Sequence, residues 1–279
     1  MKESSLLKEY FDVSFLERPL KQYNFDFLSH YIPNTTFFLS ASQRKILHET
    51  VWNALLSTEY YSSHKRLFET LLIDISYASS FLEGNTYSYF DTEVLIKYSE
   101  SAEGKTTDET AMIINHKNAL TFLMDQKNNT TYSADIFYEI HKRLGRHLLP
   151  DPDLGIIRKR PVKIGGSTYT PLDNPQKLLE EFQLFLAKIR LIKNPFEQSV
   201  FIGIFIPYFQ LFLDINKRTS RVSMNLPLII NGLPLISLLG AKQGEYFRAL
   251  LAVYELQNYE LFTDFFVTNY LQNMSRYIA

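Results

Sequence analysis

Apolar side chains recur three or four positions apart along most of this chain, the spacing that places them on one face of an α-helix. In the N-terminal half this pattern predicts helices over residues 42–57 and 60–82, and Gly84 ends the second one. The same pattern predicts two amphipathic helices over residues 107–126 and 133–146. The chain therefore reads as mainly helical.

Two Asn-Pro pairs, at residues 174–175 and 194–195, place a capping side chain directly before a proline. Proline is favoured at the first helical position because the missing N–H has no intrahelical partner there, so a long helix is expected to start at each pair. Further helices are predicted over residues 216–231 and from Gly244 to the C-terminus, with a break near residues 254–259.

One segment departs from the helical pattern. Residues 158–171 read R-K-R-P-V-K-I-G-G-S-T-Y-T-P, with β-branched residues on both sides of Gly165-Gly166, and predict a short β-hairpin. The expected fold class is therefore all-α, a helical bundle with one short hairpin. Residues 1–60 are expected to form an N-terminal helical cap, and residues 61–279 the main helical domain.

Composition excludes several classes of function. The 279 residues are 46% hydrophobic and 21% charged, with a net charge of −1 and no cysteine, so disulfides, thiolate metal sites and a cysteine nucleophile are excluded. No overall basic field attracts nucleic acid or an anionic membrane. The longest apolar run, residues 200–213, is too short to span a bilayer. With no signal or transit peptide apparent, we expect a cytoplasmic protein.

The segment Q-L-F-L-D-I-N-K-R-T-S-R, residues 210–221, changes abruptly from apolar to charged. A helix that starts near Asn216 exposes free backbone N–H groups at its N-terminus, where cations are unfavourable unless an anion offsets them. Asp214, two residues ahead, is a hard oxygen ligand suited to Mg²⁺ beside a phosphate. The segment indicates a Mg-nucleotide phosphate site. The alternative is a solvated basic surface in which Asp214 caps the helix.

Three separated motifs resemble the Fic family. D-I-N-K-R-T-S-R is similar to the end of the Fic signature, H-P-F-x-[DE]-G-N-[GK]-R-x-x-R. S-S-F-L-E-G-N-T, residues 79–86, is similar to the family's inhibitory-helix signature [ST]-x-x-x-E-[GN], which assigns residues 60–84 to an inhibitory helix. V-K-I-G-G-S-T-Y-T-P resembles the hairpin that the family calls the flap. The motifs occur in the family's order, and the resemblance covers roughly residues 75–250.

The resemblance implies a transfer of AMP from ATP to a hydroxyl of a target protein, with ATP and Mg²⁺ as cofactors. It implies that Asp214 binds Mg²⁺ and that Arg221 reaches the γ-phosphate. The phosphates would be bound by a further set of matching residues, Asn216, Lys217 and Arg218.

Two more elements gain a role from the resemblance. Glu83 would pair with Arg221 and block the productive ATP pose, with Ser79 supporting the helix and Gly84 following the glutamate. The alternative is an exposed glutamate before a glycine C-cap. A protein target would add its backbone as a strand to the flap edge, unless the hairpin is an ordinary surface feature. The residues of that edge are Lys163, Ile164, Gly165, Gly166, Ser167 and Thr168.

The sequence also departs from the family. Gln210 stands at the position of the catalytic histidine, and glutamine does not accept a proton at neutral pH. Ile215 replaces a glycine in a turn where positive φ or a close backbone approach is expected. His116 and His141, the candidate substitute bases, read as core or surface histidines, and Tyr208 is a poor base because of its high ordinary pKa.

Three functions stay open on the sequence. The chain is a Fic-type protein that binds nucleotide without usual transfer, an enzyme that works without the histidine, or a non-catalytic scaffold with a fixed Glu83–Arg221 salt bridge. The favoured hypothesis is an ATP-binding protein with impaired or altered transferase activity. The target protein is not determined by the sequence, and a homo-oligomer through the aromatic-rich N-terminal helices is compatible with it.

Overall fold

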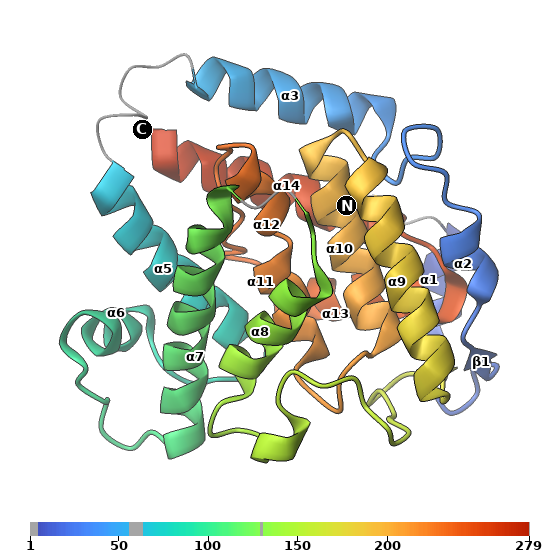
Figure 1. The fold of residues 1–279 in the computed structure, drawn as a ribbon, viewed down its shortest axis with the longest axis horizontal. Helices are drawn as coiled ribbons and strands as arrows, with labels where there is room; N and C mark the ends of the chain where they lie inside the picture. Colours follow the sequence, from blue (N-terminus) through green and yellow to red (C-terminus); the bar gives the residue numbers. More distant parts are fainter. Residues whose placement is uncertain (1–4, 56–63, 129–130, 279) are drawn as a thin grey trace.

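The computed structural model describes residues 5–55, 64–128 and 131–278, and these residues are mainly helical (Figure 1). The longer helices are α3 (Ala41–Leu55), α5 (His64–Phe81), α6 (Tyr89–Tyr98), α7 (Thr107–Met124), α8 (Ala134–Gly145), α9 (Pro175–Leu191), α10 (Pro195–Phe209), α11 (Asn216–Ser223), α13 (Gln243–Leu256) and α14 (Glu260–Ile278). The short elements are α1 (Ser5–Asp12), α2 (Phe25–Ser29), α12 (Leu226–Ile230), the 3-10 helices Asp125–Asn128 and Asp151–Asp153, and the strands β1 (Lys21–Gln22) and β2 (Tyr169–Thr170). The predicted all-α class is confirmed.

Helix α10 lies in the middle of the molecule and contacts α9, α11, α12, α13 and α14 (Figure 1). Asn194 caps it by accepting hydrogen bonds from the backbone N–H groups of Phe196 and Glu197, and Pro195 occupies its first turn. Every residue of α10 from Phe196 to Phe209 is buried, because other helices surround it. Both helix starts predicted from the Asn-Pro pairs are confirmed.

A second group of helices, α5, α7 and α8, packs side by side and meets α11. The predicted helices over residues 42–57, 107–126 and 133–146 are present as α3, α7 and α8, although residues 56–57 lie outside the described part of the chain. The predicted helix over residues 60–82 is present as α5 from His64, and its expected first residues lie outside the described part of the chain.

The single helix predicted over residues 216–231 is wrong, because the structure divides it into α11 and α12. Pro227 sits in the first turn of α12, where it supplies no N–H and disfavours helical geometry at the residue before it. Asn225, between the two helices, accepts a hydrogen bond from the Ile236 backbone N–H. The break near residues 254–259 was predicted and is present between α13 and α14.

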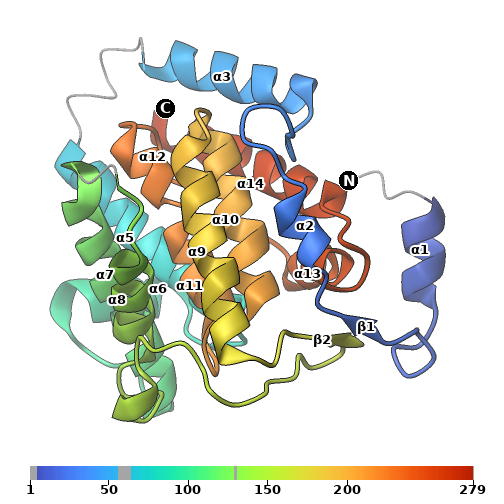
Figure 2. The same cartoon turned by 45° about the vertical axis from the view of Figure 1, so that its right-hand side comes forward.

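The predicted hairpin over residues 158–171 is only partly correct. Gly165 and Gly166 form the expected turn, and Ser167 N–H donates to the Ile164 carbonyl at 3.3 Å. Within the described residues, however, β2 does not pair with the other arm of this turn. It pairs in parallel with β1 from the N-terminal segment, with Lys21 opposite Tyr169 (Figure 2). The side chain of Tyr169 is buried and its hydroxyl donates to the Tyr208 carbonyl, which holds β2 against the core.

The N-terminal segment packs on the same core as the later helices. Buried Leu28, Tyr31 and Phe38 belong to one hydrophobic cluster with α10. Buried Glu197 of α10 accepts hydrogen bonds from the Phe38 N–H at 2.6 Å and the Tyr31 hydroxyl at 3.1 Å. The boundary near residue 60 stays a prediction. None of the helices in the described residues combines the length and the hydropathy that a membrane-spanning segment requires.

Candidate functional site

The turn from α10 to α11 is built by two left-handed residues. Gln210 ends α10 with φ of 49°, and Ile215 precedes α11 with φ of 65°. Asn216 closes the turn, because its side chain accepts from the Phe212 N–H at 2.9 Å and donates to the Phe212 carbonyl at 2.8 Å. The hydrogen-bonding capacity of the Asn216 side chain is thus used within the turn, and a phosphate contact from this residue would come from its backbone N–H.

Ile215 adopts the conformation that the sequence predicts for the glycine it replaces. Positive φ costs a β-branched residue on the order of 1–3 kcal/mol. The side chain is only 2% exposed, and its Cδ1 lies against Gly145 of α8, where an added Cβ would be 3.4 Å away. Burial of the isoleucine side chain offsets the backbone strain, so the turn keeps its shape without glycine.

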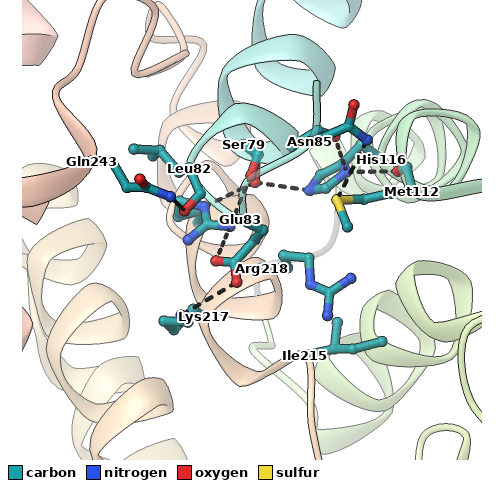
Figure 3. A network of polar contacts seen from close by, with 12 residues as sticks. Ser79, Leu82, Glu83, Asn85, Met112, His116, Ile215, Lys217, Arg218 and Gln243 are labelled. Atoms are coloured by element: carbon teal, nitrogen blue, oxygen red, sulfur yellow. Dashed lines mark hydrogen bonds and ion pairs between the residues drawn. The ribbon is translucent and has the colours of Figure 1, made fainter. Parts of the chain in front are cut away.

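Two of the three cations of α11 pair with one carboxylate from the turn that follows α5. Glu83 follows α5, and its Oε1 lies 2.8 Å from Arg221 Nη2 while its Oε2 lies 3.3 Å from Lys217 Nζ. The Glu83 side chain is 14% exposed and that of Arg221 is 1% exposed. The predicted Glu83–Arg221 ion pair is therefore present, and Figure 3 shows the Glu83 carboxylate joined to Lys217 as well. Gly84 follows with φ of 88°, as a C-cap glycine requires.

The electrostatics favour a charged Glu83. Burial alone would raise its pKa, but Arg221, Lys217 and Arg218 outweigh burial and hold the pKa below its ordinary value. Burial lowers the pKa of Lys217 and that of Arg218, while Glu83 opposes the shift in both. Arg221 Nη1 and Arg218 Nε are buried without a hydrogen-bond partner in the described structure. These two guanidinium nitrogens are therefore available to donate hydrogen bonds to an anion.

Ser79 and His116 hold Arg221 from the side of α5 and α7. Arg221 Nε donates to Ser79 Oγ at 2.8 Å, and Nη2 donates to the Ser79 carbonyl at 3.0 Å. His116 Nδ1 donates to the Met112 carbonyl at 2.8 Å, so Nε2 is left to accept from Ser79 Oγ, also at 2.8 Å (Figure 3). Burial, with some help from the arginines, lowers the pKa of His116 to about 3. His116 is a neutral core residue, as predicted.

Two aromatic rings of α13 support the same cations. The Arg221 guanidinium carbon lies 5.1 Å from the centre of the Tyr246 ring, and Lys217 Nζ lies 4.3 Å from that of Phe247. Each arrangement is within the range of a cation–π contact. Tyr246 is buried, so Arg221 is enclosed by α5 on one side and α13 on the other.

Asp214, the predicted metal ligand, lies at the solvent side of the turn. Its side chain is 68% exposed, and Oδ2 is 3.6 Å from Arg218 Nη2. Oδ1 accepts the Ile215 N–H at 2.6 Å. The described residues contain no group of three or more His, Cys, Asp or Glu that would hold a metal ion by themselves. A cation at Asp214 would therefore need other oxygens, such as those of a bound phosphate.

The residue at the base position has its amide occupied. Gln210 Nε2 donates to the Pro207 carbonyl at 2.8 Å, and Oε1 accepts from Asn216 Nδ2 at 3.1 Å. The nearby candidates are also poor bases: burial lowers the pKa of His141 to about 4, and its Nε2 lies 3.2 Å from the Asp214 carbonyl. Burial raises the pKa of Tyr208 to about 12. No substitute for the missing histidine stands out among these residues.

The flap lies next to this turn, and among the described residues no hydrogen bond or ion pair joins it to the three cations of α11. Arg158 at its base is buried, and its Nε donates to the Gln210 carbonyl at 2.7 Å. Arg158 also donates to the Arg160 and Leu172 carbonyls, so one side chain ties both ends of the flap to the turn. Lys163, Gly165 and Gly166 are exposed, Ile164 and Ser167 are half-buried, and Thr168 is buried.

Sequence reasoning missed several residues of this site. Arg158 at the base of the flap and Glu255, which fastens the flap to α13, lack a spacing that would mark them, because each acts through long-range contacts. For His116 the sequence indicated a core or surface histidine but not its hydrogen bond with Ser79. Helix α6 was missed too, although Ser88 with Asp91 three positions later is a capping signal that was available in the sequence.

The comparisons agree with this geometry. Residues 131–228 match the family model described as the Fic/DOC family. The protein adenylyltransferase fic-1 of Caenorhabditis elegans is 26% identical over 256 residues, which cover 88% of this chain and 49% of that protein. The protein adenylyltransferase Fic of Aedes aegypti is 27% identical over 190 residues, covering 67% of this chain and 38% of its own length. The chain thus spans about half or less of these relatives.

Solved structures share the fold. The structure of C. elegans Fic-1, residues 134–508 of that protein, matches with a TM-score of 0.75 at 22% identity, covering 85% of this chain and 71% of the other. A Fic domain containing signaling protein from Bacteroides thetaiotaomicron matches with a TM-score of 0.70 at 16% identity, covering 85% and 95%. The family model over residues 131–228, the motifs and the shared fold agree, and they support a protein of the Fic family.

Proposed function

We propose that this protein binds the phosphates of Mg-ATP at the N-terminus of α11 and along the face of α11 that carries its three cations, and that Glu83 holds it in an inhibited state. Lys217, Arg218 and Arg221 would contact the phosphates together with the free backbone N–H groups of α11. The adenylyltransferase names of the relatives support ATP as the nucleotide.

One observation carries the proposal. A carboxylate in the turn after α5, only 14% exposed, occupies the position of an anion between Arg221 and Lys217, and Arg221 Nη1 and Arg218 Nε have no hydrogen-bond partner in the described structure. The three cations face two carboxylates, Glu83 and Asp214, and a fixed structural salt bridge needs no such surplus of positive charge, since uncompensated charge away from water is costly. An anion with several oxygens would satisfy the donors that one carboxylate leaves free.

The residues around Asp214 fit a Mg²⁺ ion shared with a phosphate. The carboxylate is exposed beside the start of α11, and hard oxygen ligands with a substrate phosphate are the usual protein environment of Mg²⁺. When bound, the ion would offset phosphate charge. The hydrogen bond from the Ile215 N–H to Asp214 Oδ1 holds this carboxylate next to the free N–H groups of α11.

The proposed transfer of AMP to protein hydroxyls is impaired or altered in this chain. A general base typically contributes a factor of about 10²–10⁴ to the rate. The amide of Gln210 both lacks basicity and is held by Pro207 and Asn216, which argues against its placing a water or a hydroxyl for attack. A protein target would meet the flap edge, Lys163–Thr168, which stays a prediction.

The test is a calorimetric titration of Mg-ATP into the wild-type protein and the Glu83→Gly variant. Binding that appears or tightens in the variant is expected, because the competing carboxylate is gone. Adding Arg221→Met to Glu83→Gly should abolish the gain if the phosphates bind at α11. Absence of binding in both proteins would leave the alternative function, a scaffold or partner-binding protein with a fixed Glu83–Arg221 salt bridge.

A further inference from the structure

The turn of the flap is fastened to a buried carboxylate on α13. The side chain of Glu255 is fully buried, and its Oε1 accepts from Ser167 Oγ at 2.8 Å and from the Thr168 N–H at 3.1 Å. Hydrogen bonds to a desolvated charge are stronger than neutral ones. The second half of the flap is therefore held to α13 by its backbone as well as by a side chain.

The same carboxylate anchors the N-terminal arm, by which we mean residues 18–23. Arg18 Nη1 donates to Glu255 Oε2 at 2.9 Å, and its Nη2 donates to the Gly166 carbonyl at 3.0 Å. The Arg18 side chain is 6% exposed, and Tyr10 adds a hydrogen bond to Glu255 Oε2 at 2.9 Å. The two terminal nitrogens of the Arg18 guanidinium thus join the arm to both the flap turn and α13. A lysine, with a single ammonium group, does not offer this planar pair of donors.

The arm also pairs with the flap through its backbone. Lys21 N–H donates to the Thr168 carbonyl and Tyr23 N–H donates to the Thr170 carbonyl, both at 3.1 Å. Figure 2 shows β1 and β2 side by side below α13. The Tyr23 ring packs 5.1 Å from that of Tyr208, so the arm is also tied to the end of α10. The side of the flap from Lys163 to Gly165 has no strand partner in the described structure.

Helix α13 therefore carries two supports on one rigid element. Tyr246 and Phe247, in its first turns, lie against the cations Arg221 and Lys217, while Glu255, near its end, holds the flap. A helix of this length transmits position along its axis because its backbone hydrogen bonds run without a break.

We propose that the N-terminal arm is a working part of the flap, and that Arg18 and Glu255 are positioning residues that set where the free edge, Lys163–Gly165, is presented to a protein acceptor. The acceptor side of this inference rests on the proposed function. The arm of the same chain already pairs with β2, the second strand of the flap, so an acceptor that docks by strand addition can pair only with the first strand. Loosening the arm should weaken acceptor docking and leave the phosphate site intact.

The position of the free edge can be followed with one label. The sequence has no cysteine, so Lys163→Cys introduces a single thiol for a spin label on an exposed flap residue. Lys21→Pro removes the N–H that bonds the Thr168 carbonyl. Gln22→Pro is the matched control, because bonding to β2 alternates along the strand and the Gln22 N–H points away from it.

We expect Lys21→Pro to raise the mobile fraction of the label roughly fivefold, the factor that corresponds to one lost backbone hydrogen bond, with little change in the control. Arg18→Met combined with Glu255→Gln, which removes the anchor without stranding a charge, should have at least the same effect. These variants also decide the matter if Lys21→Pro fails to fold. Equal mobility in Lys21→Pro and Gln22→Pro, or an unchanged label in the Arg18 and Glu255 double variant, would overturn the proposal.

A functional measurement separates positioning from general damage. In a Gln210→His, Glu83→Gly background, dephosphorylated β-casein serves as an extended acceptor of AMP. Its hydroxyl oxygen bonds to the α-phosphorus, the bond to the β-phosphate breaks, pyrophosphate leaves and the proton passes to the new histidine. Lys21→Pro should raise KM for casein severalfold and leave KM for Mg-ATP unchanged, whereas a parallel change in both would refute positioning. An inactive background would count against the proposed function, and the label experiment would still decide the role of the arm.

Discussion

Replacing Glu83 with glutamine tests the idea that the α11 cations are built for an anion. The change keeps the shape of the side chain but removes its charge, and it leaves Arg221, only 1% exposed, without a carboxylate. Removing one partner of a buried ion pair typically costs about 3–5 kcal/mol because the other charge stays buried. We expect a loss near the lower end, since Ser79 still accepts two hydrogen bonds from Arg221.

The measurement is urea unfolding and thermal unfolding of both proteins at pH 7.5, with and without Mg-ATP. A loss of ~3 kcal/mol corresponds to a fall in Tm on the order of 10 °C for a chain of this size. A ligand at a hundred times its Kd restores about 2.7 kcal/mol, so Mg-ATP should return most of the lost stability to the variant.

The matched control is Glu245→Gln. Glu245 also pairs with a lysine, Lys242 at 3.1 Å, but its side chain is 42% exposed. An exposed pair is worth less than about 1 kcal/mol, so this variant should unfold close to the wild type and gain nothing extra from Mg-ATP. Wild-type stability of ligand-free Glu83→Gln would refute the reasoning about buried charge. A destabilised variant that Mg-ATP does not rescue would refute the phosphate site.

Three further predictions follow from the same geometry. Gln210→His in the Glu83→Gly background should raise AMP transfer to protein hydroxyls by at least about 100-fold over Glu83→Gly alone, measured with labelled ATP, and no gain would mean that the turn itself is unsuitable. The folded-state pKa values of His116 and His141, about 3 and about 4, lie below the ordinary value, so the unfolded chain binds more protons than the folded chain below about pH 6.5. The free energy of unfolding therefore decreases as the pH is lowered through this range. Each histidine should remove about 2 kcal/mol between pH 7 and pH 5, and urea unfolding that is independent of pH would contradict this. Ile215→Gly should lower the free energy of unfolding by about 1–3 kcal/mol, because the loss of a buried side chain outweighs the relief of backbone strain. In the Glu83→Gly background it should also tighten Mg-ATP binding, and calorimetry measures both effects.

Much of the site was visible in the sequence. The order of apolar and charged residues in 210–221 predicted an anion site at a helix start, which stays a prediction, and in the structure Lys217 and Arg221 pair with one carboxylate whose pKa Arg218 also helps to lower. The glycine position occupied by Ile215 predicted positive φ, which is present. These features depend on neighbours in the chain, so local patterns are enough to find them.

The flap shows where such patterns fail. Two β-branched stretches around Gly165-Gly166 predict a hairpin, yet β2 pairs with residues 21–22, about 150 positions earlier in the chain. The strand propensity was right and the partner was wrong, because a short edge takes the partner that tertiary packing brings close. The anchor of that partner, Arg18 with Glu255, is also a contact between distant segments.

The sequence by itself determined that this protein is helical, where most of its helices begin, and that a cluster of cations follows a buried helix. Helix caps, apolar spacing and left-handed turns are properties of a few adjacent residues. Only the tertiary structure decided which carboxylate faces those cations, that His116 stays neutral behind Ser79, and that the N-terminal arm completes the flap. Burial sets the charge of a histidine and the strength of an ion pair, and burial exists only after distant segments have packed together.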